Sequence, residues 1–193
     1  MQLRPDAQLK TMIKAMTDVI IPALDGSNQL AMEQSRLVVG MMILMERQLP
    51  LQFRFDRDEL ARLIETAHDL VALAGAEREG GLERARCTAA AVLDRCQAGP
   101  DDLHLAVRDM RVAICDTIDR INDPGADADA TLIAACDAIV LRMSQQQLLR
   151  DRVLLLPQGW ELQPDALPDI ETLIADRKAD IGNDASGVYR EAP

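Results

Sequence analysis

Apolar positions recur along most of the chain three and four residues apart, which is the repeat of an amphipathic helix. The clearest stripe follows Asp56, and it consists of Leu60, Leu63, Ile64, Ala67, Leu70 or Val71, and Ala74. We expect Asp56 to cap this helix, with Glu59 as its capping-box partner and Phe55 stapled onto Leu60. The pattern therefore predicts a helix that opens near residue 56.

The same periodicity predicts five further helical segments. They cover about 6–21, about 27–49, a stretch after the Gly80–Gly81 break, a stretch after the turn AGPDD, and about 129–143. The fifth helix in chain order carries the most regular apolar line, consisting of Leu103, Val107, Met110, Ile114, Ile118 and Ile121. Helices joined by short turns pack as antiparallel neighbours, so the fold class that we predict is all-α, an antiparallel bundle of about six helices.

The pattern changes after Leu156, where Pro157, Pro164 and Pro168 fall close together. Proline removes a backbone donor and ends helices, so we expect a mostly extended arm, a short helix at about 169–180 and a loose tail. The predicted organisation is a helical bundle over 1–156 and an arm over 157–193 that is not an independent domain.

Composition and charge narrow the function classes. Aromatic residues make up only 2% of the 193 residues, which favours helix over strand. The net charge is −11, and residues 61–193 hold 24 acidic against 14 basic side chains. Nucleic acid and anionic membrane surfaces are therefore not expected partners. The longest apolar run, Leu37–Met45, spans only about 14 Å as a helix, so we interpret it as a buried helix and not as a membrane span.

The two histidines each follow a carboxylate by three residues, in Glu65–His68 and Asp101–His104. Acid-x-x-His is the ligand spacing of di-metal sites in four-helix bundles, where the ligands must project inward. With about 100° between successive residues, both acids lie about 160° and both histidines about 100° from the centre of their apolar stripes. The phase predicts solvated surface pairs, so we assign no metal site.

No catalytic residue and no cofactor are assigned, because the sequence holds no nucleophile elbow and no phosphate-binding glycine loop. Of the four cysteines, Cys96 and Cys136 lie on apolar faces and are expected to be buried, whereas Cys87 lies opposite its stripe. Without a recognisable signal peptide, we expect reduced thiols and a cytoplasmic location.

Polar residues in phase with apolar stripes suggest a ligand site. Gln34 lies in phase with Leu30 and Leu37, Thr117 lies at the edge of its stripe, and Gln147 and Arg150 continue the line of the sixth helix. One hypothesis is that Gln34, Thr117, Gln147 and Arg150 end an apolar pocket, with Arg150 meeting a carboxylate or phosphate. The alternative is that the sixth helix ends or leaves the core near Ser144.

Trp160 is the only tryptophan and lies on the arm. It anchors the arm either on its own bundle or, as an exchanged arm, on a second copy in a homodimer. Six methionines fall in the first two helices, where they serve as core filler or as a soft groove for an apolar partner.

Two stretches, MIKAMTDVIIPALD at Met12–Asp25 and LPLQFRFDRDEL at Leu49–Leu60, resemble a family of small bacterial all-helical proteins with no assigned activity. The resemblance covers roughly the first third of the chain and implies a helical, cytoplasmic, bacterial protein. It carries no catalytic motif, so it transfers no functional residue.

The function that the sequence favours is a non-enzymatic interaction or assembly protein that forms a homo-oligomer with Trp160 at an interface. The alternative is a module that holds a small apolar, acyl-like anion between helices. An enzyme would need either the helix phase of the acid–histidine pairs to differ by about 100° or residues supplied by another chain.

Overall fold

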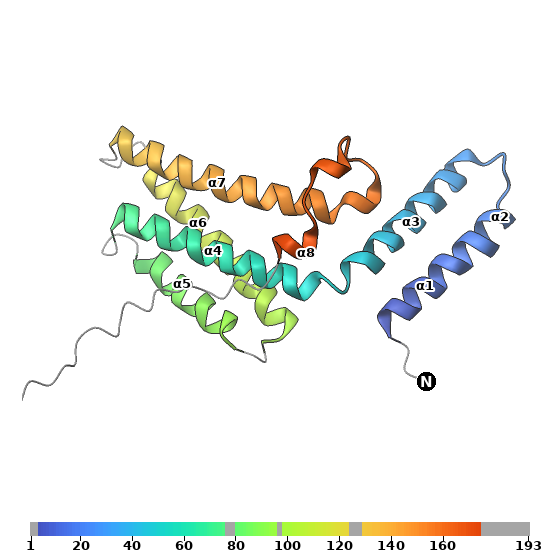
Figure 1. Cartoon of the computed structure of the whole chain (residues 1–193), viewed down its shortest axis with the longest axis horizontal. Helices are drawn as coiled ribbons and strands as arrows, with labels where there is room; N and C mark the ends of the chain where they lie inside the picture. The colour runs from blue at the N-terminus through green and yellow to red at the C-terminus, as the bar shows by residue number, and fades with distance from the viewer. Residues whose placement is uncertain (1–3, 76–79, 96–97, 124–128, 175–193) are drawn as a thin grey trace, which may run out of the picture. The chain divides into compact units, whose positions relative to one another are not determined.

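The computed structural model describes residues 4–75, 80–95, 98–123 and 129–174, and all regular structure in these ranges is helical (Figure 1). The predicted all-α fold is therefore confirmed. In chain order the helices are α1 (Pro5–Ala15), a π-helical turn η1 (Met16–Ile20), α2 (Ile21–Ala23), α3 (Gln29–Gln48), α4 (Gln52–Ala74), α5 (Gly80–Leu93), α6 (Pro100–Ile121), α7 (Ala130–Leu154), the 3₁₀ turns η2 (Leu156–Gln158) and η3 (Pro164–Ala166), and α8 (Ile170–Leu173).

The chain divides into two compact units. Unit 1 comprises Met1–Phe55 and Ser144–Leu173, and unit 2 comprises Asp56–Met143 and Ile174–Pro193. The boundaries fall inside α4 and inside α7, so both helices contribute residues to both units. The predicted arm lies in unit 1 up to Leu173, and its last described residue, Ile174, belongs to unit 2.

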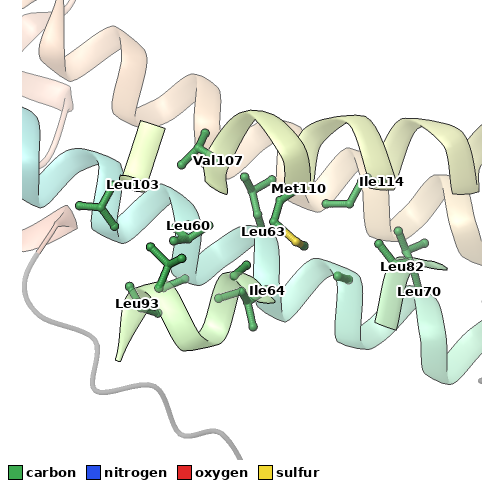
Figure 2. Close-up of a cluster of buried hydrophobic side chains, with 14 of the residues drawn as sticks. Leu60, Leu63, Ile64, Leu70, Leu82, Leu93, Leu103, Val107, Met110 and Ile114 are labelled. Carbon is green, nitrogen blue, oxygen red and sulfur yellow. The ribbon is translucent and has the colours of Figure 1, made fainter. Parts of the chain in front are cut away.

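Unit 2 is built from four helices that run in alternating directions, namely most of α4, α5, α6 and the first half of α7 (Figure 1). Their apolar stripes meet in one core, where Leu60 and Leu63 from α4 face Leu82 and Leu93 from α5 and the α6 line from Leu103 to Ile114 (Figure 2). Cys136 of α7 closes this core. Burial of these side chains, at about 25 cal/mol per Å², supplies most of the driving force for folding this unit.

Two predicted boundaries are wrong. Helix α4 begins at Gln52, so Asp56 lies inside the helix and does not cap it. No residue between Pro50 and Asp56 is a glycine or a proline, and the helix therefore extends back to the proline-containing turn. Helix α7 continues through Ser144 to Leu154, so it does not end near Ser144, although it passes from unit 2 into unit 1 there.

Unit 1 contains a helical hairpin in which α1 packs against α3 (Figure 1). Asn28 caps α3, because its side-chain oxygen accepts a hydrogen bond from the amide of Ala31 at 3.1 Å. An ion pair of 3.5 Å joins Lys10 to Glu46, the first from α1 and the second near the end of α3. The helix predicted at about 6–21 ends at Ala23, close to Pro22. It contains a π turn that the apolar periodicity did not indicate.

The arm is fastened to the rest of unit 1 at several points. Gln158 donates to the carbonyl oxygen of Gly40 at 3.4 Å, which ties η2 to α3. Arg152 pairs with Glu161 at 2.9 Å, and Arg54 pairs with Glu171. The part of the arm that the structure describes is therefore held by its own chain.

Candidate interaction surface

The two units differ sharply in where they place their apolar side chains. Among the described residues, fourteen of the seventeen exposed large apolar side chains belong to unit 1, whereas eighteen of the twenty-two buried hydrophobic residues of any size belong to unit 2. The described lengths of the two units are similar, so size does not explain the difference. Unit 2 covers its own core, and unit 1 leaves apolar surface open.

Helix α3 carries much of this open surface. The largely apolar run from Leu37 to Met45, which we expected to be buried, is covered on one side only. Val39 and Ile43 share a helix face with Glu46, which pairs with Lys10 of α1, and both are half-buried. The opposite side presents an exposed stripe, which we call the α3 stripe, consisting of Leu30, Leu37, Val38, Met41 and Met45.

The α3 stripe is a single face of the helix. At about 100° per residue, its five members spread over about 100° of arc, and Gln34 falls near the middle of that arc. Gln34, the first residue of the predicted ligand site, is exposed on this face. An apolar face of this width is typical of a helix packed against another helix.

Trp160 adds an exposed ring on the arm, close in sequence to the point where the arm bonds to α3. It lies two residues after Gln158, which bonds to Gly40 of α3, and its side chain is 73% exposed. Leu162 is 95% exposed. The left-handed conformation of Gly159, with a φ of 71°, ends η2 and turns the chain toward these two residues. These two are the most exposed large apolar side chains among the described residues.

A pocket of about 280 Å³ lies elsewhere in unit 1. Its wall is mostly apolar and is formed by the end of α3, the end of α7 and the arm, with Arg47 and Asp169 as its charged members. The lining residues are Arg47, Gln48, Leu51, Val153, Leu154, Leu156, Pro157, Pro168, Asp169 and Ile170. The volume is close to the lower limit of pockets that enclose small ligands.

None of the four predicted ligand residues lines this pocket. Gln147 donates to Asp151 at 2.8 Å, one turn further along α7. Arg150 is buried, as the ligand hypothesis required, but its guanidinium donates to the carbonyl oxygens of Gln146 and Leu173. The ligand hypothesis has the guanidinium N–H groups of Arg150 bind an anion, whereas in the structure two of them bind these carbonyl oxygens.

Thr117 belongs to unit 2, whereas Gln34, Gln147 and Arg150 belong to unit 1. Thr117 is fully buried on α6, where its hydroxyl donates to the carbonyl of Ala113 at 3.0 Å and accepts from Arg120 at 2.9 Å. This is the usual way for a helical threonine to satisfy its hydroxyl, so Thr117 has a structural role.

Both acid–histidine pairs lie on exposed faces, as their helix phase predicts. Glu65 and His68 are exposed on α4, and Asp101 and His104 are exposed on α6. In the part of the chain that the structure describes, no three His, Cys, Asp or Glu side chains gather as a set of metal ligands.

The cysteines follow their phases where they are described. Cys136 is buried, and its burial raises the pKa of the thiol. Cys87 and Cys115 are exposed, and Cys96 lies outside the described residues. A raised thiol pKa disfavours the reactive thiolate, so Cys136 is a structural side chain.

The sequence interpretation missed a buried charged cluster on α4. Asp58 and Arg62 form an ion pair of 2.9 Å one turn apart, and both side chains are almost fully buried. Glu59, also buried, pairs with Arg111 of α6, yet burial raises the pKa of its carboxyl. The signal was present as charged residues interleaved with the apolar stripe, and of these only Glu59 was assigned a role, in capping. The cluster links helices and offers no open surface for a ligand.

Comparison of the chain with protein-family models, with curated proteins and with solved structures gives no match. No described helix combines the length and the apolar character that crossing a bilayer requires. Function is therefore inferred from residue geometry.

Proposed function

We propose that this protein is a non-enzymatic assembly protein that forms homo-oligomers through unit 1. The observation that carries the proposal is the concentration of exposed apolar side chains on unit 1, beside a unit 2 that buries its own core. Exposed apolar area on this scale costs free energy in water, and contact with another protein removes that cost. Trp160 and the α3 stripe are the expected contact residues.

The experiment that tests this function is native mass spectrometry of the untagged chain, combined with sedimentation over a range of concentrations. A homo-oligomer that loses no mass when stripped of small molecules supports the proposal. A strict monomer at every concentration would contradict it. Substitution of Trp160 by alanine gives a second readout, because it should weaken association while leaving the unfolding midpoint of the monomer unchanged.

A second candidate function rests on the unit 1 pocket. Its apolar wall and the guanidinium of Arg47 suit a small apolar anion such as an acyl chain with a carboxylate. The same mass spectrum tests it, since a retained ligand adds its own mass to the 21.3 kDa of the chain. The residue to change first is Arg47, because Arg150 already donates to carbonyl oxygens.

A further inference from the structure

We infer that the unit 1 pocket binds a free apolar amino acid of about the size of leucine. The inference rests on the second candidate function, ligand binding in this pocket, and narrows the ligand from an apolar acid to a compact apolar zwitterion. It begins from the two opposite charges that line the pocket, Arg47 and Asp169.

The volume of the pocket limits the size of the ligand. At about 30 Å³ for each water-sized group, a pocket of about 280 Å³ holds roughly nine non-hydrogen atoms. Free leucine, isoleucine and methionine have this size, whereas a long-chain fatty acid or a nucleotide is too large. The pocket therefore suits a small metabolite with a short apolar body.

The apolar wall lies inside the pocket and the charges lie at its mouth. Val153 is buried, and Leu51 and Leu154 are half-buried. Arg47 and Asp169 are both exposed. A ligand that enters with its apolar end first therefore keeps its polar end beside the two charged side chains. Removal of the apolar end from water supplies the larger share of the affinity.

The two charges are available to a ligand because they do not neutralise each other. In the described part of the chain no ion pair joins Arg47 to Asp169, and the guanidinium of Arg47 has no other side-chain partner there. Oδ1 of Asp169 accepts the amide hydrogen of Glu171 at 3.2 Å, which leaves its second oxygen for a ligand donor. A ligand that carries both a carboxylate and an ammonium group satisfies both side chains at once.

Ligand binding is coupled to the fastening of the arm. The pocket wall includes Pro157 at the start of the arm and residues 168–170 further along it, so the pocket exists only while both parts lie in place. Glu171, whose amide holds Asp169, also pairs with Arg54 of α4. A ligand that binds only the fastened arm stabilises that state by mass action. The amino acid should therefore slow the release of the arm.

The first test compares three ligands that share one branched apolar body, with the full-length chain in isothermal titration calorimetry. They are leucine, isocaproate, which lacks the ammonium group, and isopentylamine, which lacks the carboxylate. Leucine should bind about fivefold more tightly than either, because each missing charge removes one exposed ion pair. Alanine keeps both charges without the branched body, and it should bind at least about tenfold more weakly than leucine.

Two substitutions assign these charges to residues. Asp169→Asn keeps the bond to the Glu171 amide, because asparagine also caps helices, and it should lower the affinity for leucine to about that for isocaproate. Arg47→Gln should lower it to about that for isopentylamine. The matched controls are Asp165→Asn and Arg36→Gln, which are exposed positions outside the pocket wall and should leave the affinity for leucine unchanged.

The second test locates the bound amino acid. The amides of Glu171 and Leu173 both bond to Asp169, so saturating leucine should slow their hydrogen exchange. The buried core of unit 2 is the internal control, and exchange at Leu103 should not change.

The outcomes separate this inference from the functions proposed above. Isocaproate that binds as tightly as leucine would overturn the amino acid site and leave an apolar acid as the ligand. Failure of all three ligands to bind would overturn both the amino acid site and the pocket function, while assembly would stand. Tighter binding of leucine that neither pocket variant changes, or that does not slow exchange at Glu171, would place the ligand elsewhere and overturn the site.

Discussion

Arg150 and Leu173 are 23 residues apart in the sequence, and the guanidinium of Arg150 donates a hydrogen bond of 3.0 Å to the carbonyl oxygen of Leu173. A second bond, to the carbonyl of Gln146 at 3.1 Å, fixes the same side chain to its own helix. Arg150 is only 4% exposed. A buried charge whose donors meet carbonyl oxygens ties the end of the arm to α7 inside unit 1.

Replacing Arg150 by methionine should destabilise the chain and release the arm. The loss of the charge-assisted bond to the Leu173 carbonyl costs about 1–3 kcal/mol, whereas the Gln146 carbonyl keeps its bond within α7. Urea unfolding measures the loss, and hydrogen exchange around Leu173 reports release of the arm. Arg152→Ala is the control, because its ion pair with Glu161 is partly exposed and its removal should barely move the unfolding midpoint. An unchanged exchange rate at Leu173 in the methionine variant would contradict the anchoring role.

Asp58→Ala should be among the most damaging single changes in unit 2. It leaves the buried guanidinium of Arg62 without its carboxylate at 2.9 Å, and breaking one side of a buried ion pair costs about 3–5 kcal/mol. The double variant Asp58→Leu with Arg62→Met should recover a large part of that loss, since it removes both charges. Thermal unfolding of the three proteins tests this. A double variant as unstable as the single one would show that shape, and not the stranded charge, sets the cost.

The stability of unit 2 should depend on pH through Glu59. Its pKa is raised in the folded state, first by burial, and the pairing with Arg111 only partly offsets this. Between the ordinary pKa and the raised one, the folded chain binds more protons than the unfolded chain, so stability falls as pH rises through that window. The free energy of unfolding of the parent minus that of Glu59→Gln should therefore decrease from acid to neutral pH. A free-energy difference that grows with pH would contradict the assignment.

Leu60 and Leu37 should respond oppositely to the same substitution. Leu60 is fully buried in unit 2, so Leu60→Ala should lower the free energy of unfolding by about 2–5 kcal/mol. Leu37 is 60% exposed, so Leu37→Ala should leave the unfolding of the dilute chain nearly unchanged while raising the dimer Kd. Denaturation at low protein concentration, paired with sedimentation, separates the two effects. A large stability loss from Leu37→Ala in the dilute chain would show that α3 is covered by its own chain.

The stripes of unit 2 were predictable because each depends on one helix at a time. The residues expected to face inward on α4 and α6, such as Leu60 and Leu103, are buried, and those expected to face outward, such as Glu65 and His104, are exposed. The start of α4 was not predictable from Asp56, because a good capping residue is also tolerated inside a helix when nothing before it stops the helix.

The rest depended on contacts that periodicity does not contain. The position of Arg150 is decided by a carbonyl oxygen on the arm, and the helix phase of α7 holds no information about that partner. The Leu37–Met45 run was expected to be buried, but one side of it is exposed. An apolar pattern does not state whether the same chain supplies a surface that covers it. The unit 1 pocket likewise arises where α3, α7 and the arm converge.

The path of the chain through the two units has an entropic consequence. Unit 1 is made from two pieces, up to Phe55 and from Ser144 to Leu173, and residues 56–143 form the connection between them. If that connection were an unstructured loop, bringing its ends together would cost roughly 4 kcal/mol by the (3/2)RT ln n relation. When unit 2 is folded, the entropy of this connection has already been lost. Loss of the core around Leu60 would therefore also raise the free energy needed to hold the two pieces of unit 1 together. The surface of unit 1 proposed for assembly therefore depends on the core of unit 2 through the connectivity of the chain.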